Sequence, residues 1–237
     1  MFTSLRQIAT LSLLLFGFSA HANFVKNGSF EQSTGTAAQT NPSLNHTSFS
    51  SYSPTNWSIA SGGLSYVLAP GTADGSGYLS VWGPFPNSSP DGGNFVMQDG
   101  DTNYSRLISQ TITGLTVGQS YLLSFYQAAG QQKGFNGATT ERWKVGFGSD
   151  VKYSSLISLP SNGVGPWQLE TMRFTAQSQS QILTFLAQGT PNGQPPMSFL
   201  DGVRVEEIPD PTRLWLMFAG LLGWGTIQLR RTGKSAS

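Results

Sequence analysis

Short apolar segments with a two-residue period recur through the second half of the chain, and they constrain its fold more than any other feature. Tyr121, Leu123 and Phe125, for example, would share one face of an extended strand. Gly, Pro or Asn clusters separate nearly all of these segments, and no long 3.6-residue period lies between the two ends of the chain. The pattern predicts an all-β protein with a single antiparallel β-sandwich of the jelly-roll type. The expected strands are 107–112, 120–128, 142–147, 167–174, 181–187 and 198–206.

The part that precedes these strands is less regular. Residues 23–31 predict a first extended strand with an Asn-Gly turn at Asn27 and Gly28. The region 32–54 is polar and rich in loop residues, so it holds too few apolar side chains to form core by itself.

Composition excludes several classes of function. The chain has no cysteine, which rules out disulfides, thiolate nucleophiles and cysteine-ligated metal centres. Residues 23–208 carry eight Lys or Arg against eleven Asp or Glu, a net charge of −3. A mildly acidic body without a basic stripe argues against a nucleic-acid partner.

The N-terminus has the pattern of a secretory signal peptide. Arg6 precedes the apolar run 8–18, and Ala20 and Ala22 supply the small residues of a cleavage site. We therefore expect a signal peptide over 1–22 that is read by the Sec export machinery and cut after Ala22. The alternative is a membrane anchor, but this run is far shorter than the roughly 20 apolar residues that span a bilayer.

The C-terminus combines a proline-flanked acidic residue, an apolar run and a basic end. Pro209, Asp210 and Pro211 precede a predicted transmembrane segment at about 212–229, which Arg230 and Arg231 follow. The basic end should stay cytoplasmic. The alternative is a buried core helix, which three glycines within the run disfavour.

This C-terminal arrangement resembles the PEP-CTERM sorting signal of Gram-negative bacteria, with Asp210 where the family usually has Glu. The resemblance implies an exosortase as processing partner for the tail 208–237. It also implies an exported protein that passes through an inner-membrane intermediate to the cell surface or the extracellular matrix.

The body, 23–207, also resembles a known family. Its opening NFVKNGSFE, its closing SFLDGVRVEEI and the segment 99–148 resemble strands of galactose-binding-like jelly rolls, the fold of many carbohydrate-binding modules. The resemblance implies a structural calcium held by Glu31 and Asp201. A second calcium candidate is the loop of Asp99, Gly100 and Asp101, although a plain turn is the favoured interpretation there.

Aromatic side chains on loops are the expected carbohydrate-binding surface, because flat rings pack against the C–H faces of sugars. Trp82 is the first candidate and Trp57 the second, with Gln131 and Asn136 as polar helpers. Two further tryptophans, at 143 and 167, fall in strand-like runs and are interpreted as core residues.

The sequence offers no recognisable catalytic constellation. His46 stands alone in a polar loop, so no Ser-His-Asp triad can be completed without it. The leading hypothesis is a non-catalytic surface protein that binds or organises exopolysaccharide and needs no cofactor beyond the calcium. A glycoside-acting enzyme with two carboxylates is one alternative. A purely structural or adhesive surface protein is the other.

Overall fold

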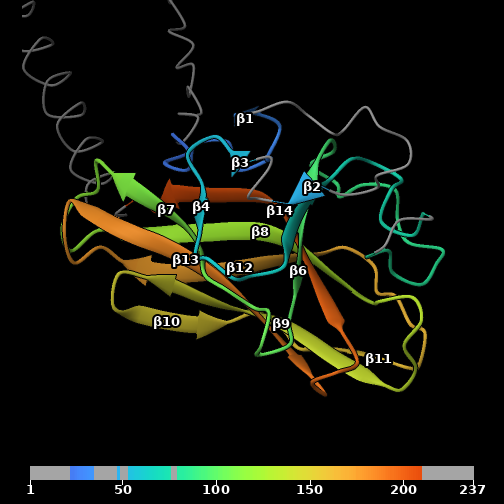
Figure 1. The fold of residues 1–237 in the computed structure, drawn as a ribbon. Helices are drawn as coiled ribbons and strands as arrows, with labels where there is room; N and C mark the ends of the chain where they lie inside the picture. Colours follow the sequence, from blue (N-terminus) through green and yellow to red (C-terminus); the bar gives the residue numbers. More distant parts are fainter. Residues whose placement is uncertain (1–21, 35–46, 49–52, 76–78, 210–237) are drawn as a thin grey trace, which may run out of the picture.

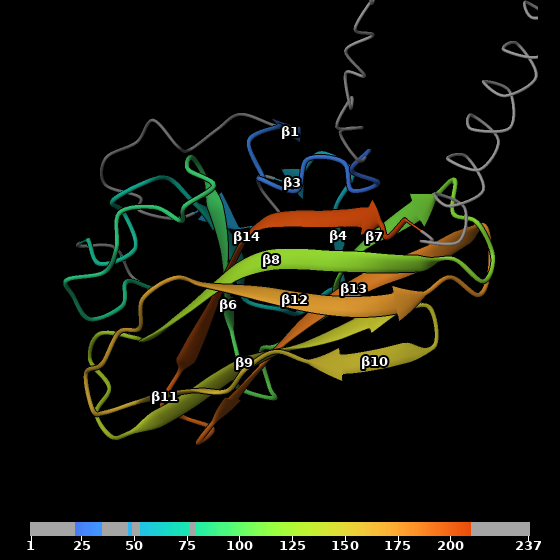
Figure 2. The same cartoon turned by 180° about the vertical axis from the view of Figure 1, so that it is seen from behind.

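The computed structural model describes residues 22–34, 47–48, 53–75 and 79–209. In this part of the chain most strands form two antiparallel sheets packed face to face, and no residue is helical (Figures 1 and 2). The predicted antiparallel β-sandwich is therefore confirmed. Among these residues there is accordingly no helix able to cross a membrane.

The two predicted end signals lie almost wholly outside the described residues. The signal peptide falls on 1–21, and the apolar run and basic end of the tail fall on 210–237. Of these two segments only Ala22, Ile208 and Pro209 are described; Ala22 and Pro209 are exposed, and Ile208 is partly buried.

The first sheet, called sheet I, has the strand order β12–β8–β14–β6–β5–β2. Its strands are β12 (Gln168–Thr175), β8 (Ser120–Gln131), β14 (Pro196–Glu207), β6 (Phe95–Asp99), β5 (Ser65–Leu68) and β2 (Thr47–Ser48). The second sheet, called sheet II, has the order β10–β9–β13–β7–β4, and β11 also pairs with β9. Its strands are β10 (Asp150–Tyr153), β9 (Thr139–Phe147), β13 (Ser180–Thr190), β7 (Ile108–Thr113), β4 (Ser58–Ile59) and β11 (Ile157–Leu159). A small ribbon joins β1 (Ser33–Thr34) to β3 (Ser53–Pro54).

Alternating burial explains why the strands of the second half were predictable. Tyr121, Leu123 and Phe125 of β8 are buried, and the residues between them are more accessible, as a half-buried strand requires. The same alternation marks β9 and β13, which pair from Leu183 with Phe147 to Thr190 with Thr140. All six expected strands are present with ends shifted by a few residues.

Aromatic side chains occupy the centre of the core between the sheets. The Phe185 ring lies 5.2 Å from Phe125, 6.0 Å from Trp143 and 6.3 Å from Trp57, centroid to centroid. Trp143 also donates a hydrogen bond across the sandwich from its indole nitrogen to the Phe199 carbonyl, at 3.0 Å. These contacts tie β13 and β9 of sheet II to β8 and β14 of sheet I.

A second apolar cluster covers one end of sheet I from outside. Phe85 packs 4.3 Å from Phe199, and Trp167 packs 5.4 Å from Phe95. Because loops carry Phe85 and Trp167 over the sheet, β6 and most of β14 are buried on both faces. This explains why β6 lacks the two-residue period.

The N-terminal segment differs from its prediction. Residues 23–31 contain the expected turn, with Asn27 at a φ of 52°, but they form no strand. They run instead beside β14, where Phe24 donates to the Val205 carbonyl and Gly28 accepts from the Val203 amide. A register shift in β14 between Asp201 and Arg204 supplies the bend that this irregular pairing follows.

Gly28 is the position where this pairing tolerates no side chain. A Cβ there would lie 2.0 Å from the Val203 carbonyl oxygen, which is backbone and cannot move aside. We expect Gly28→Ala to lower the free energy of unfolding by about 1–3 kcal/mol. Urea unfolding checks this, with Gly92→Ala as control for the loss of a glycine. Gly92 has open space at its Cβ but a φ of 82°, so its cost should be smaller and purely conformational. Equal stability of Gly28→Ala and the unmodified protein would contradict the account.

Candidate functional site

One cavity lies on the outer face of sheet II, the face turned away from sheet I. It has a volume of about 530 Å³ and sits over β9 and the C-terminal half of β13. Loop residues after β6 and before β11 form its rim. The lining comprises Gly100, Thr102, Ser105, Thr140, Arg142, Leu156 and residues 186–190.

The floor of this cavity follows from the alternation of the strands. Glu141, Trp143 and Val145 of β9 point into the core, so Arg142 and Lys144 point outward. Arg142 is the cross-strand partner of Gln188, which also lines the cavity. A cross-strand hydroxyl pair, Thr140 and Thr190, lies beside them at 2.6 Å between the oxygens.

The ring of Tyr153 stacks on Arg142, the cationic side chain of the cavity floor. Tyr153 of β10 is the cross-strand partner of Lys144, and its ring centroid lies 4.4 Å from the Arg142 guanidinium carbon. The Tyr153 side chain is 49% exposed, so one side of the ring stays accessible. Sequence reasoning missed both Arg142 and Tyr153. The sequence signal that could have indicated Arg142 was its position, like that of Lys144, at an outward-facing place of a strand whose neighbouring residues Trp143 and Val145 are apolar.

A smaller cavity of about 260 Å³ lies on the same face, at the β4 and β7 edge. Ser109 and Thr111 of β7 line it, and they pair with Thr184 and Ile182 of β13. The buried Gln110 side chain holds Lys26 at this edge by accepting from its amide and donating to its carbonyl, both at 2.8 Å.

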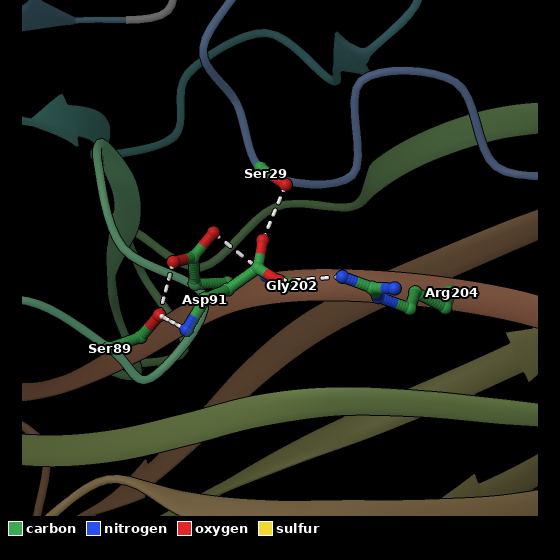
Figure 3. Close-up of polar contacts among 6 residues, drawn as sticks. Ser29, Ser89, Asp91, Gly202 and Arg204 are labelled. Atoms are coloured by element: carbon green, nitrogen blue, oxygen red, sulfur yellow. Dashed lines mark hydrogen bonds and ion pairs between the residues drawn. The ribbon is translucent and has the colours of Figure 1, made fainter.

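Three carboxylates gather where the N-terminal segment meets β14. Asp91 accepts a hydrogen bond from Ser29 at 2.5 Å and forms an ion pair with Arg204 at 2.8 Å (Figure 3). Asp201 accepts from Ser89 and from the Gly202 amide. Glu31 accepts from the Asn94 amide. The structure thus brings the predicted pair Glu31 and Asp201 together and adds Asp91, which no pattern in the sequence indicated.

Burial dominates the electrostatics of this cluster. The Asp201 side chain is 0% exposed, and the loss of solvation raises its pKa to about 8. Hydrogen bonds from Ser89 and Gly202 oppose the rise, whereas the nearby Asp91 and Glu31 add to it. Burial also raises the pKa of Glu31, and Asp91 contributes to that rise.

The side chains of this cluster are of the type that binds calcium, but their present arrangement is not that of a calcium site. Carboxylate oxygens are the ligands that Ca²⁺ prefers. In the described residues, however, no three His, Cys, Asp or Glu side chains converge as a ready metal site. A bound ion would therefore require Asp91 to turn away from Arg204 and Ser29.

The four predicted carbohydrate-binding residues separate into two places. Trp57 lies in the core, 3% exposed, with its ring 5.2 Å from Phe30 and its indole donating to the Asn27 carbonyl. This packing leaves no free ring face for a sugar. The interpretation of Trp143 as a core residue is confirmed, and Trp167 packs on the outer cluster of sheet I.

The other three predicted residues lie together at one end of the sandwich. Trp82 is partly buried, donates from its backbone amide to the Gln131 carbonyl, and donates from its indole to the Phe135 carbonyl at 3.0 Å. The Gln131 side chain is fully buried, donates to Gly137 and accepts from the Asn162 amide. Asn136 is exposed on the loop between β8 and β9. Trp82 is thus partly accessible and Asn136 is exposed, whereas the Gln131 amide group is already hydrogen-bonded to the loop residues Gly137 and Asn162.

The loop of Asp99, Gly100 and Asp101 is a turn held by its own carboxylates. Asp101 accepts from the amide and the side chain of Asn103 and from the Gly193 amide. Asp99 accepts from the Asp101 amide. These hydrogen bonds close the loop on itself, so the geometry supports the turn interpretation.

Sequence comparisons are limited. No protein-family model matches the chain. Halomucin from Haloquadratum walsbyi is 29% identical over 189 residues, which cover 80% of this chain. The chain spans only about 2% of the length of that protein.

The similar solved structures are distant in sequence. TmCBM61, solved in complex with β-1,4-galactotriose, is 14% identical with a TM-score of 0.46, covering 79% of this chain and 99% of that one. The CBM22-1 xylan-binding domain of Paenibacillus barcinonensis Xyn10C is 12% identical with a TM-score of 0.42, covering 81% and 97%. The enzymatically active domain of tailspike protein 4 from bacteriophage CBA120 is 12% identical with a TM-score of 0.38, covering 78% and 21%.

Proposed function

We propose that this chain is a non-catalytic glycan-binding protein whose binding site is the cavity on the outer face of sheet II. The observation that carries the proposal is the composition of that cavity. An arginine, an amide and paired hydroxyls line one concave surface of about 530 Å³, and the exposed Tyr153 ring lies beside it against Arg142. Sugars need this combination, because their C–H faces pack on rings and their hydroxyls take fixed polar partners.

The carboxylates of the body support a binding role over a catalytic one. A glycoside-acting enzyme needs two carboxyl groups that reach the glycosidic bond. Asp201 is 0% exposed and Glu141 is 1% exposed, so neither of these strongly perturbed groups can touch a polysaccharide. Asp101 is also buried and is committed to N–H donors.

The destination of the protein is proposed from its termini. The signal-peptide pattern ending at Ala22 supports Sec-dependent export, and the pattern from Pro209 to Arg231 supports exosortase processing after a membrane intermediate. In this proposal the body then acts at the surface or in the extracellular matrix of a Gram-negative bacterium, where it binds exopolysaccharide.

Binding of the purified protein to a panel of soluble polysaccharides tests the proposed function. We expect Tyr153→Ala to weaken the affinity about tenfold, because the ring is lost and Arg142 loses its support. Leu169→Ala is the control, since Leu169 is similarly exposed, at 57%, but lies on β12 of sheet I, away from the cavity. Absence of binding at millimolar ligand would favour the purely structural or adhesive role. Equal affinity of Tyr153→Ala and the unmodified protein would contradict the placement of the site.

We also propose a structural calcium at Glu31 and Asp201, with Asp91 as a third ligand. Near-saturating Ca²⁺ at about a hundred times its Kd should add about 2.7 kcal/mol of stability, a rise of roughly 5–10 °C in Tm. Thermal unfolding in Ca²⁺ and in EDTA measures the difference. Asp201→Asn should abolish the rise, whereas Asp150→Asn, on β10, should keep it. The same Tm in Ca²⁺ and in EDTA would contradict the calcium proposal.

A further inference from the structure

We propose that the cavity on the outer face of sheet II selects acidic glycans, specifically those that carry uronic-acid carboxylates. The inference rests on the proposed function and names the ligand class of the same site. It depends on three features of this face: an unpaired but immobilised guanidinium, outward positions of β7, β9 and β13 that carry no Asp or Glu among the described residues, and a neutral surface that suits a sugar ring.

The guanidinium of Arg142 is fixed without being neutralised. Within the described residues it forms no ion pair or hydrogen bond, yet it lies 4.4 Å from the centroid of the Tyr153 ring. Stacking on an aromatic face restricts the side chain while leaving its N–H donors available. A group ordered before binding loses less conformational entropy when a ligand arrives. Arg142 is therefore a cation prepared for an anionic partner.

The rest of the face has a single sign of charge. Lys144 points outward beside Arg142, and Lys26 lines the smaller cavity on the same face. The described outward positions of β7, β9 and β13 carry no Asp or Glu, because Glu141 points into the core. A mildly acidic body thus presents one locally cationic surface. Such a surface attracts polyanions and makes their binding sensitive to salt.

The carboxylates on either side of Gly100 do not cancel this charge by pairing with it. Asp99 and Asp101 flank Gly100, but both are buried and accept hydrogen bonds from backbone amides of the turn. The rim offers Gly100, Thr102 and Ser105 to the cavity instead.

The neutral lining indicates a sugar acid instead of an inorganic anion. Leu156 is 55% exposed beside the cavity, and Leu186 lines it together with the hydroxyl pair of Thr140 and Thr190. Apolar surface next to hydroxyls suits a pyranose ring, while the planar guanidinium fork matches a carboxylate in a bidentate contact. A uronic-acid residue has both a pyranose ring and a carboxylate, so it can make both kinds of contact.

Affinity measurements with glycans of different charge test the selection. Polygalacturonate and alginate carry carboxylates, galactan and xylan serve as neutral polymers, and dextran sulfate supplies sulfate groups. We expect the uronates to bind at least about tenfold more tightly than the neutral polymers at low salt, and to weaken as the salt concentration rises. Arg142→Gln should remove most of this preference. Arg142→Lys should restore it only in part, because Lys lacks the bidentate fork. Arg173→Gln, on the exposed face of β12, is the matched control and should leave binding unchanged.

The outcomes separate the inference from the proposed function. Equal affinity for uronates and neutral polymers overturns the acidic selection but leaves glycan binding intact. No binding to any polymer overturns both. Equal affinity for dextran sulfate or single-stranded DNA overturns the uronate class, because it would show a general polyanion site. A folded Arg142→Gln variant with an unchanged Tm and an unchanged uronate preference overturns the role of Arg142.

Discussion

Replacing Trp143 by alanine is expected to lower the free energy of unfolding by about 3–5 kcal/mol. The side chain is fully buried, packs edge-on against Phe185 and donates to the Phe199 carbonyl across the sandwich. Its loss would leave a large cavity between the sheets and an unpaired buried carbonyl. Equilibrium unfolding in urea measures the effect. The substitution should also abolish glycan binding at temperatures where the variant unfolds, because β9 carries Arg142 on its opposite face.

Two further variants separate the causes of this loss. Trp143→Phe keeps most of the apolar volume and removes only the donor, so it should cost less, about 1–3 kcal/mol. Lys144→Ala changes the next residue, which points outward, and should stay within about 0.5 kcal/mol of the unmodified protein. A Trp143→Ala variant as stable as Lys144→Ala would contradict the central position of this side chain.

The stability of the protein should fall as the pH rises from 4 to 9. Burial raises the pKa of Asp99 to about 6, of Glu141 to about 7 and of Asp201 to about 8. Neither oxygen of Glu141 has a hydrogen bond of ordinary geometry, and the nearby Thr139 hydroxyl offsets only part of the rise. Each group binds its proton more tightly in the folded protein than in the unfolded chain. The resulting stabilisation is complete below about pH 4 and is lost as the pH passes through 6 to 8.

We expect the free energy of unfolding in EDTA to drop by at least about 3 kcal/mol across this range. Asp201→Asn should flatten the curve above pH 7, because asparagine has no proton to lose. Glu207→Gln is the control for the change in net charge and lies at the partly exposed end of β14. Calcium should also flatten the upper part of the curve, since it favours the ionised Asp201. Constant or rising stability between pH 4 and 9 would contradict the buried, neutral state of these carboxyl groups.

The fold was largely predictable where one face of a strand is buried and the other is not. The alternation at Tyr121, Leu123 and Phe125 located β8 within a few residues. Prediction failed where that condition does not hold. All five residues of β6 are buried because loops carrying Phe85 and Trp167 cover its outer face. Residues 23–31 form hydrogen bonds with a bent part of β14, and no local sequence pattern predicts this pairing.

The site was harder to predict than the fold, because sequence shows the type of a side chain but not its neighbours. Trp57 has the composition of a sugar-binding residue, yet Phe30 and Phe185 enclose its ring. Asp91 joins Glu31 and Asp201 from a loop about sixty residues away from the first and more than a hundred from the second. Arg142 acquires its role only because β10 folds back and places Tyr153 beside it.

The most direct test of the binding site is an amide chemical-shift map of the protein titrated with short uronic-acid oligomers. The cavity on sheet II predicts shifts concentrated in residues 140–144 of β9 and 186–190 of β13, with further shifts at Gly100 to Ser105 on the rim. Shifts confined to Trp82 and the loop around Asn136 would contradict this account and place the glycan at the end of the sandwich.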